Sequence, residues 1–597
     1  MTITIILPII AALLIILFYT GLPALKTSPL KRAEPEQRRM RRGDWLAAAI
    51  ITLCYAAVAF IGLGDVEAAQ NPHIFDPAEP AVIELEKESP LGRMRIYCGI
   101  NVGKYYIEYS QDGENWGYAG ELEQNYVAVL KWKSVELSEE VQSTPVKYIR
   151  ITADNDMYLT ELAVYNTYGD MLAQSSANAP ELCDEQQLVP EADSFMNSSY
   201  FDEIYHVRTA IEHREGIWPY EISHPPLGKL IIGIGIGLFG VTPFGWRFMG
   251  TLFGVLMLPV MYVFLKKLFG GKAAPVAGTV IFAADFMHFV QTRIATIDTY
   301  AIFFILLMYL FMYMWLEDGK KRYLALSGVF FGLGAASKWT CIYAGAGLAV
   351  LWALHWIIAA RDKERPKDGR LFDRFAENCG FCVIFFVLIP AVIYYVSYYP
   401  YGAAKGLHGL GALFTKDYAK IVLDNQSFMF NYHSGVTASH PYSSRWYQWI
   451  LDIRPILYYL EYGVNGTRQS FGAFVNPILC WAGLLALVVL GYEAIAKRDR
   501  RAAFILIGYL AQLLPWVFIT RITFEYHYFA CTVFLVMALA YVIELMRQWN
   551  PRWRIYAVGI AVLCVAVFAM FYPALTGVTV NNAAASRLLK WLPTWPF

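Results

Sequence analysis

Two adjacent carboxylates, Asp202 and Glu203, begin the part of this sequence that is richest in reactive side chains. That part covers residues 201–229. Its other ionisable groups include three histidines and several cations: His206, Arg208, His213, Arg214, His224 and Lys229. Long apolar segments lie on both sides of it. Ionisable groups beside a bilayer are costly and are usually retained for function. We therefore take residues 201–229 as the candidate site.

The composition indicates an integral membrane protein. Hydrophobic residues make up 57% of the 597 residues, charged residues only 16%, and the mean hydropathy is +0.38. In a soluble protein, roughly a quarter of the residues are charged. Helical spans are the usual way to cross a bilayer with every backbone group hydrogen-bonded. The net charge is zero, so nothing indicates a nucleic-acid partner.

Apolar runs predict twelve spans with both termini outside. They are 3–22, 45–63, 246–266, 274–291, 298–316, 323–338, 341–359, 377–397, 472–492, 503–520, 524–546 and 555–574. The loop 26–44 is rich in Lys and Arg, which places it in the cytoplasm by the positive-inside rule. The apolar run 230–240 is too short to cross. We expect it to lie flat in the outer interface. If it crossed instead, five later basic loops would all lie outside: 266–272, 317–322, 361–370, 497–501 and 547–554.

Residues 65–195 have a different character, with polar and apolar residues alternating between turn signals. This pattern predicts an extracytoplasmic β-sandwich. The runs 106–116 and 147–165 resemble the discoidin, or coagulation factor 5/8 type C, family of jelly-roll modules. That family often binds glycans or lipid headgroups. A spacer or docking role is the alternative. Cys98 and Cys183 could form a disulfide if this segment lies outside the cytoplasm.

Cations gather at the predicted outer ends of the spans, among them Arg247, Arg293 and Arg521. The cytoplasmic side offers no Walker loop, no G-x-G-x-x-G after a strand and no loop longer than about twenty residues for a nucleotide. An activated group is therefore best delivered outside on a lipid phosphate. Arginine suits such a phosphate because it binds bidentately and stays charged.

A sugar transferred to a hydroxyl needs a general base, and Asp202 can take the hydroxyl proton. The departing phosphate needs positive charge. We add His224, Lys229, Arg445 and His527 to the predicted donor site. Arg445 could instead stack on a neighbouring tryptophan, and His527 could belong to an interfacial aromatic belt. His206 and His213 have no third ligand at suitable spacing, so we expect no metal and no certain cofactor.

Seven motifs resemble the protein O-mannosyltransferase family. They are FDE-x-x-H at 201–206, HPPLGK at 224–229, FGWRFMGTLFG at 244–254, RIATIDTY at 293–300, SKWT at 337–340, HPYSSRWYQW at 440–449 and FEYHYF at 524–529. The resemblance implies a GT-C fold, a multispanning helical bundle with juxtamembrane helices in a large first external loop. It also implies transfer of mannose, with inversion, from polyprenyl-phosphate mannose to Ser or Thr of a secreted or translocating protein.

Carried over to this chain, the resemblance assigns Asp202 and Glu203 to the family's acidic pair, with Asp202 as the base. It places Arg247 near the donor phosphate. The chain lacks the β-trefoil module of eukaryotic members and has an additional N-terminal span and the inserted sandwich. It therefore looks like a bacterial member, in the plasma membrane with its active site facing outside. These departures leave the acceptor more open than the donor.

The predicted organisation has six parts: two spans with a basic loop (1–64), the β-sandwich (65–195), a catalytic segment with juxtamembrane helices (196–245), spans (246–398), an external loop (399–470), and spans with an external C-terminus (471–597). One alternative keeps the donor and changes the acceptor to a lipid or wall polymer, as in relatives that modify lipid A. Another is a transporter or glycan-sensing receptor. Against a transporter, we find neither ionisable residues at mid-membrane nor paired broken helices.

Overall fold

The computed structural model describes residues 30–362 and 370–597, so the predicted span 3–22 lies outside the described residues. The chain divides into two compact units. The β unit comprises residues 62–215 and 232–249. The helical unit comprises residues 216–231 and 250–597 together with the segment that ends at Ile61.

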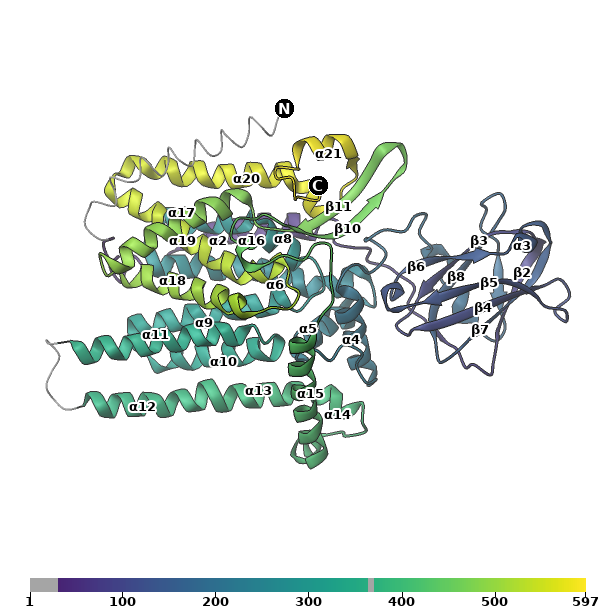
Figure 1. Ribbon diagram of the computed structural model, residues 1–597, viewed down its shortest axis with the longest axis horizontal. Coiled ribbons are helices and arrows are strands. Elements are labelled where there is room, and N and C mark those ends of the chain that lie inside the picture. Colours follow the sequence, from purple (N-terminus) through teal and green to yellow (C-terminus); the bar gives the residue numbers. More distant parts are fainter. Residues whose placement is uncertain (1–29, 363–369) are drawn as a thin grey trace. The chain divides into compact units, whose positions relative to one another are not determined.

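The β unit contains a curled sheet of nine antiparallel strands in the order β1-β8-β3-β6-β5-β4-β7-β2-β9 (Figure 1). The strands are β1 (His73–Ile74), β2 (Ala81–Ser89), β3 (Leu91–Cys98), β4 (Gly103–Ser110), β5 (Gly117–Gln124), β6 (Trp132–Leu137), β7 (Val146–Ala153), β8 (Tyr158–Asn166) and β9 (Gln174–Ser176). In β7 the alternation of the sequence is visible directly, because Ile149, Ile151 and Ala153 are buried in the core while the residues between them are only partly buried.

These strands confirm the prediction of an inserted all-β domain, whereas its likeness to discoidin modules stays a prediction. The β unit also contains the short helix α3 (Glu139–Ser143) and helix α4 (Glu203–Glu215). Cys98 and Cys183 are free thiols, so the disulfide considered for them is not formed.

Nine helical segments within the described residues are long and apolar enough to cross a bilayer. They are α2 (Arg42–Phe60), α6 (Pro243–Phe269), α9 (Asp298–Asp318), α11 (Cys341–Arg361), the continuous segment Leu371–Ala403, α17 (Pro477–Ile495), α18 with its 3-10 extension (Arg500–Phe518), α19 with its 3-10 start (Glu525–Trp549) and α20 with its 3-10 start (Pro551–Thr576). The chain is an integral membrane protein. The predicted total of twelve spans is not confirmed, because α10 (Lys321–Ser337) has only 17 residues.

The predicted span 274–291 is a broken pair of helices, α7 (Ala273–Ala283) and α8 (Phe286–Thr292), bent by 54°. The break has a local cause. Asp285 caps α8 by accepting the backbone N–H of His288, and it also accepts the backbone N–H of Asn476. A carboxylate that holds two backbone donors ends one helix and starts the next. The predicted span 274–291 is therefore interrupted by a bend, and that it crosses the membrane stays a prediction.

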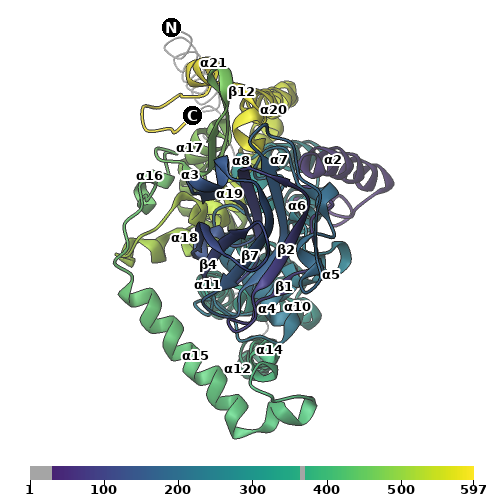
Figure 2. The same cartoon turned by 90° about the vertical axis from the view of Figure 1, so that its right-hand side faces the viewer.

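The run 230–240 lies in helix α5 (Leu227–Phe239), which has 13 residues and is shorter than a span. The segment Leu371–Ala403 joins α12 (Leu371–Val383), η4 (Ile384–Leu388), α13 (Ile389–Ser397) and α14 (Tyr399–Ala403). Helix α15 (Lys416–Gly435) follows through η5 (Leu410–Phe414), and Figure 2 shows it as a long helix between the α14 region and α16 (Trp446–Trp449). A small sheet of β10 (Ile456–Tyr462), β11 (Thr467–Ala473) and β12 (Val580–Asn581) and the short helix α21 (Asn582–Leu588) complete the helical unit.

Candidate functional site

The acidic pair lies where α4 begins. Glu203 is its first residue, and the Glu203 carboxylate accepts the backbone N–H of Tyr200 at 3.2 Å. The carbonyl of Asp202 accepts the N–H of His206 at 3.2 Å. Phe201, directly before the pair, has φ of 47°, a left-handed conformation that a bulky residue rarely adopts. Backbone strain of this kind often occurs beside functional side chains.

The two acids of the pair have different surroundings. Asp202 is partly exposed, whereas the side chain of Glu203 is 0% exposed. Glu203 forms a bidentate ion pair with Arg247 of α6, through Nε to Oε1 and Nη2 to Oε2, each at 2.8 Å. The indole N–H of Trp246 donates to the same carboxylate at 3.3 Å. Glu203 is therefore a buried, charge-compensated group, and Asp202 is the partly exposed acid of the pair.

Arg247 holds several chain segments of the β unit together. Besides Glu203, its guanidinium donates to the carbonyls of Leu63 at 2.9 Å, Phe195 at 2.7 Å and Ser198 at 2.9 Å. Its side chain is only 1% exposed. Every nitrogen of the fork is thus committed to protein oxygens. The expectation that Arg247 contacts the donor phosphate does not fit this geometry, and we reassign Arg247 to positioning Glu203 and the start of α4.

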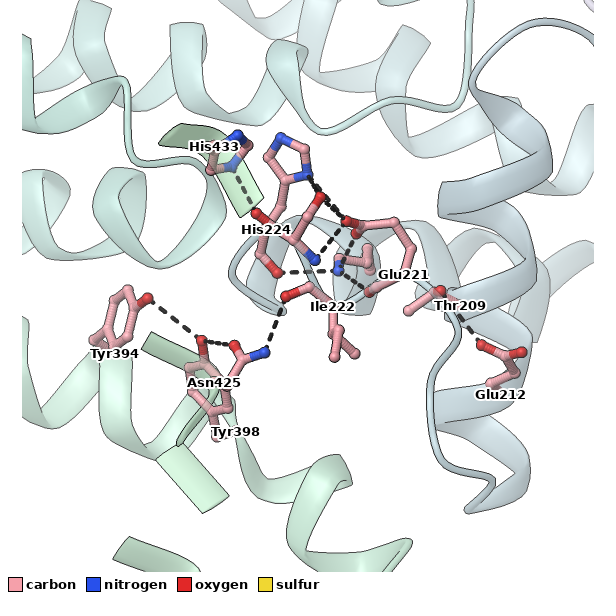
Figure 3. Close-up of polar contacts among 11 residues, drawn as sticks. Thr209, Glu212, Glu221, Ile222, His224, Tyr394, Tyr398, Asn425 and His433 are labelled. Atoms are coloured by element: carbon pink, nitrogen blue, oxygen red, sulfur yellow. Dashed lines mark hydrogen bonds and ion pairs between the residues drawn. The ribbon is translucent and has the colours of Figure 1, made fainter. Parts of the chain in front are cut away.

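In the helical unit, the loop before α5 is organised by a buried acid, Glu221 (Figure 3). The ammonium of Lys229 donates to the Glu221 carboxylate, to the Glu221 carbonyl at 2.7 Å and to the His224 carbonyl at 3.0 Å. Lys229 is 0% exposed. The three N–H groups of its ammonium thus donate to three protein oxygens. The expected contact of Lys229 with a phosphate is therefore not supported, and its role is to fold the loop.

His224 and His433 meet beside this loop. Their rings are 5.1 Å apart, and His224 Nδ1 lies 3.1 Å from the Glu221 carboxylate. Nε2 of His433 donates to the carbonyl of Ser223 at 2.8 Å (Figure 3). Burial lowers the pKa of both histidines, and the positive charge of Lys338 adds to the effect. Both rings are therefore neutral near pH 7.

Helix α15 is attached to the same loop at two points. His433 supplies one, and the side-chain amide of Asn425 supplies the other by donating to the carbonyl of Ile222 at 2.9 Å. Asn425 is itself held by the hydroxyl of Tyr398, which donates to its Oδ1 at 2.7 Å (Figure 3). A chain of hydrogen bonds thus runs from the end of α13 through α15 to the loop that carries His224.

Acidification is expected to loosen α15. The pKa of His433 is lowered to about 4, because of burial and because of the nearby charges of His224, Arg521 and Lys338. Its ordinary value is about 6.5. Between these values the undocked histidine binds more protons than the docked one, so the attachment is stable above about pH 6.5 and weakens as the pH falls towards 4. Because solvent screens this partly exposed ring, we expect the attachment of α15 to lose about 1 kcal/mol of free energy on acidification.

The measurement is hydrogen exchange of the α15 amides, expressed as protection factors at pH 5 and pH 7.5. We expect roughly fivefold less protection at pH 5, which corresponds to about 1 kcal/mol. The variant His433→Gln keeps a donor for the Ser223 carbonyl but does not titrate, so its pH dependence should be smaller. Equal protection at both pH values in the unmodified chain would contradict the assignment.

Each of three further cations at the ends of helices contacts a different protein group. Lys338 forms a buried ion pair with Asp298 at 2.7 Å and lies 5.5 Å from the centre of the Tyr526 ring. Arg293 donates to the carbonyl of Ile61 at 2.8 Å. The Arg445 side chain donates to the carbonyl of Thr520 at 3.0 Å, so it is held by a loop rather than by a tryptophan. The phosphate contacts expected of Arg293 and Arg445 stay predictions.

Arg521 keeps several guanidinium donors that a ligand could use. Across residues 30–362 and 370–597, its guanidinium makes one hydrogen bond, to the Ile522 carbonyl at 3.2 Å, and no ion pair. It is partly exposed and lies close enough to His433 to lower the pKa of that ring. The His527 ring is 4.4 Å from both Trp516 and Tyr526 and stacks on Trp449 at 5.9 Å, so it lies in an aromatic cage.

Two residues that hold the site were not found from the sequence. Glu221 lies inside the stretch 201–229, and a lone acid eight residues before Lys229 was a usable signal. Asn425 gave no such signal, because an amide in the middle of a polar helix is ordinary. Lys338 of the SKWT motif pairs with Asp298, which the sequence analysis did not anticipate.

Two family profiles match the chain. Residues 223–394 match the family described as dolichyl-phosphate-mannose-protein mannosyltransferase. Residues 419–595 match the C-terminal four-span region of protein-O-mannosyltransferase. The chain belongs to the protein O-mannosyltransferase family. Neither profile match reaches the acidic pair or the nine-stranded sheet, which both lie before residue 223.

Curated bacterial relatives extend the match. The polyprenol-phosphate-mannose–protein mannosyltransferase of Mycobacterium tuberculosis is 25% identical over 492 residues, which is 73% of this chain and 90% of the relative. The enzyme of the same name from Corynebacterium glutamicum is 25% identical over 481 residues, covering 71% of this chain and 90% of the relative.

A solved structure supports the fold. The S. cerevisiae protein O-mannosyltransferase Pmt1–Pmt2 complex bound to the sugar donor aligns with a TM-score of 0.57 and 12% identity, over 67% of this chain and 89% of that chain. The GT-C fold predicted from the sequence is thereby confirmed.

Proposed function

We propose that this chain transfers mannose from a polyprenyl-phosphate donor to Ser or Thr hydroxyls of proteins. Membership of the protein O-mannosyltransferase family carries the proposal, because bacterial relatives named for this reaction align over about nine-tenths of their length. Each of the two units supplies one side chain of a suitable kind. One partly exposed carboxylate, Asp202, is held at the start of α4, and a partly exposed arginine, Arg521, lies near neutral histidines.

In this proposal Asp202 is the general base. The acceptor oxygen forms a bond to the anomeric carbon of mannose as the bond from that carbon to the phosphate oxygen breaks. The hydroxyl proton moves to the Asp202 carboxylate, and polyprenyl phosphate leaves with both electrons of the broken bond. Attack opposite the leaving phosphate inverts the anomeric centre. Glu203 cannot share this task, because its carboxylate is held by Arg247.

Arg521 is the first candidate for the departing phosphate. The charge of a leaving phosphate needs a donor that is fixed and charged, and arginine meets both needs. His224 and His433 are neutral near pH 7 and can donate hydrogen bonds without adding charge. We place His527 and Arg445 in the same donor region, as supporting contacts.

Replacing Arg521 by Ala is expected to raise the KM for the donor by about 10- to 100-fold, the usual effect of losing a hydrogen bond to a charged group. Arg521→Lys should recover part of this, because the charge remains while the bidentate geometry is lost. Arg587 is an exposed arginine of α21, so Arg587→Ala serves as the matched control. Initial rates over a range of donor concentrations give the result. An unchanged donor KM in Arg521→Ala would remove Arg521 from the donor site.

We propose that the active site faces outside in a bacterial plasma membrane. Each of the five basic loops lies between two successive helices, and the positive-inside rule assigns such loops to the cytoplasm. This orientation places the loops around Asp202, His224 and Arg521 on the opposite side. A secreted protein acceptor would reach them there.

The direct test incubates the purified full chain with polyprenyl-phosphate mannose and a Ser/Thr-rich peptide, and detects mannosylated peptide by mass spectrometry. We expect a mass increase of one hexose on the peptide, and none when the donor is omitted. Transfer to a lipid or wall polymer but never to peptide would move the acceptor to the alternative class. If the donor is not turned over with any acceptor, the assignment of this chain as an enzyme is wrong.

A further inference from the structure

A trough of about 870 Å³ lies between α7 and α20 in the helical unit. Its walls are small apolar side chains, including Val276 and Ala277 of α7 and Ala561 and Val562 of α20. Both helices belong to the membrane part of the chain. Small residues leave room for a chain of methylene groups between two helices.

The wall formed by α20 faces the surroundings of the protein. Val558 is 61% exposed and Val562 is 60% exposed. An exposed apolar row on a span is the surface that lipid chains cover, because no water is present at that depth. The trough is therefore open to the hydrocarbon of the bilayer.

One end of the trough is cationic. Lys272, Arg547 and Arg554 line it. Arg547 is compensated by Glu544, to which its Nε donates at 2.8 Å. Lys272 and Arg554 are exposed, and neither forms an ion pair or a side-chain hydrogen bond within the described ranges 30–362 and 370–597. This end therefore carries two positive charges that the described protein does not neutralise.

The same end lies at headgroup level. Trp549 and Trp553 stack there with ring centres 6.1 Å apart, as expected for an interfacial aromatic belt. Lys272 and Arg554 belong to the basic loops 266–272 and 547–554, which the positive-inside rule assigns to the cytoplasm. The cations thus face the leaflet that carries anionic lipid headgroups.

We propose that the trough between α7 and α20 binds an anionic phospholipid of the cytoplasmic leaflet. Its phosphate lies between Lys272 and Arg554, and one acyl chain lies along the Ala/Val walls. Basic pockets between helices on this side of a membrane are suited to such headgroups. The site is separate from the proposed donor site, because it lies at the opposite ends of the spans.

The test counts lipids bound to the purified full chain by native mass spectrometry. Phosphatidylglycerol and phosphatidylcholine with identical acyl chains are titrated separately. We expect phosphatidylglycerol to bind at least tenfold more tightly. The double variant Lys272→Ala/Arg554→Ala should lose most of this preference, because each cation near the surface contributes about fivefold. Arg552→Ala is the matched control, since Arg552 is an exposed arginine two residues away that does not line the trough.

A second pair of variants tests the apolar wall. Val562→Trp fills the trough from an exposed position and should reduce binding of both lipids, whereas Ile555→Trp, at an exposed position of α20 outside the trough, should not. Equal affinity for the two lipids would overturn the proposal. So would a double variant that keeps the unmodified affinity for phosphatidylglycerol, or a Val562→Trp chain that binds lipid normally.

Discussion

The variant Asp202→Asn is expected to lower kcat for mannosyl transfer by about 10²- to 10⁴-fold, the usual contribution of a positioned general base. Asn has nearly the same shape but cannot take the acceptor proton. The KM for the donor should change little, because Asp202 is not assigned to the phosphate. The measurement is the initial rate of peptide mannosylation at saturating donor and acceptor, with the pH profile of kcat recorded for both chains. The acidic limb of the profile should disappear in Asp202→Asn.

Glu215→Gln supplies the control for this experiment. Glu215 is an exposed acid at the other end of the same helix, so its replacement changes the charge of α4 equally without touching the pair. Its activity should equal that of the unmodified chain. If Asp202→Asn keeps the full kcat and the same pH profile, another group takes the proton and the base assignment is wrong.

Properties of the chain that depend on hydropathy could be predicted from the sequence. Apolar runs located every described span to within a few residues, and the length of 230–240 identified α5 as too short to cross. The broken pair α7 and α8 was missed for a physical reason. Mean hydropathy over a window hardly registers one carboxylate, yet Asp285 ends the helix because it holds two backbone donors.

The candidate site was predicted less completely, because the sequence shows which charges exist but not which charges meet. Glu203 and Arg247 were both assigned to chemistry as separate groups. They lie 44 positions apart, and the fold pairs them with each other. Lys229 was also assigned to the donor site because of its position near a span. In the structure, the carboxylate of Glu221 neutralises its charge. Arg521 has no acid within reach among the described residues, so it keeps the role that its position at a span end suggested.

Replacing Arg247 by Met is expected to destabilise the chain by about 3–5 kcal/mol, the usual cost of leaving one partner of a buried ion pair uncompensated. Glu203 would keep its charge in a site that is 0% exposed, and the carbonyls of Leu63, Phe195 and Ser198 would lose their donors. Unfolding of the purified chain in detergent, followed by tryptophan fluorescence against denaturant, measures the change. Arg214→Met is the control, because Arg214 is exposed and makes one hydrogen bond, to the Gly233 carbonyl; it should cost less than about 1 kcal/mol.

Two further variants separate a positioning role of Arg247 from a role in donor binding. In the double variant Glu203→Gln/Arg247→Met neither partner is left as an unpaired buried charge, so part of the stability should return and the two substitutions should couple by more than about 1 kcal/mol. Arg247→Lys keeps the charge but loses the bidentate fork. If Arg247 positions the acidic pair, this variant lowers kcat and leaves the donor KM unchanged. A raised donor KM with an unchanged kcat would instead return Arg247 to the phosphate, because only a group that contacts the donor in the ground state changes its KM alone.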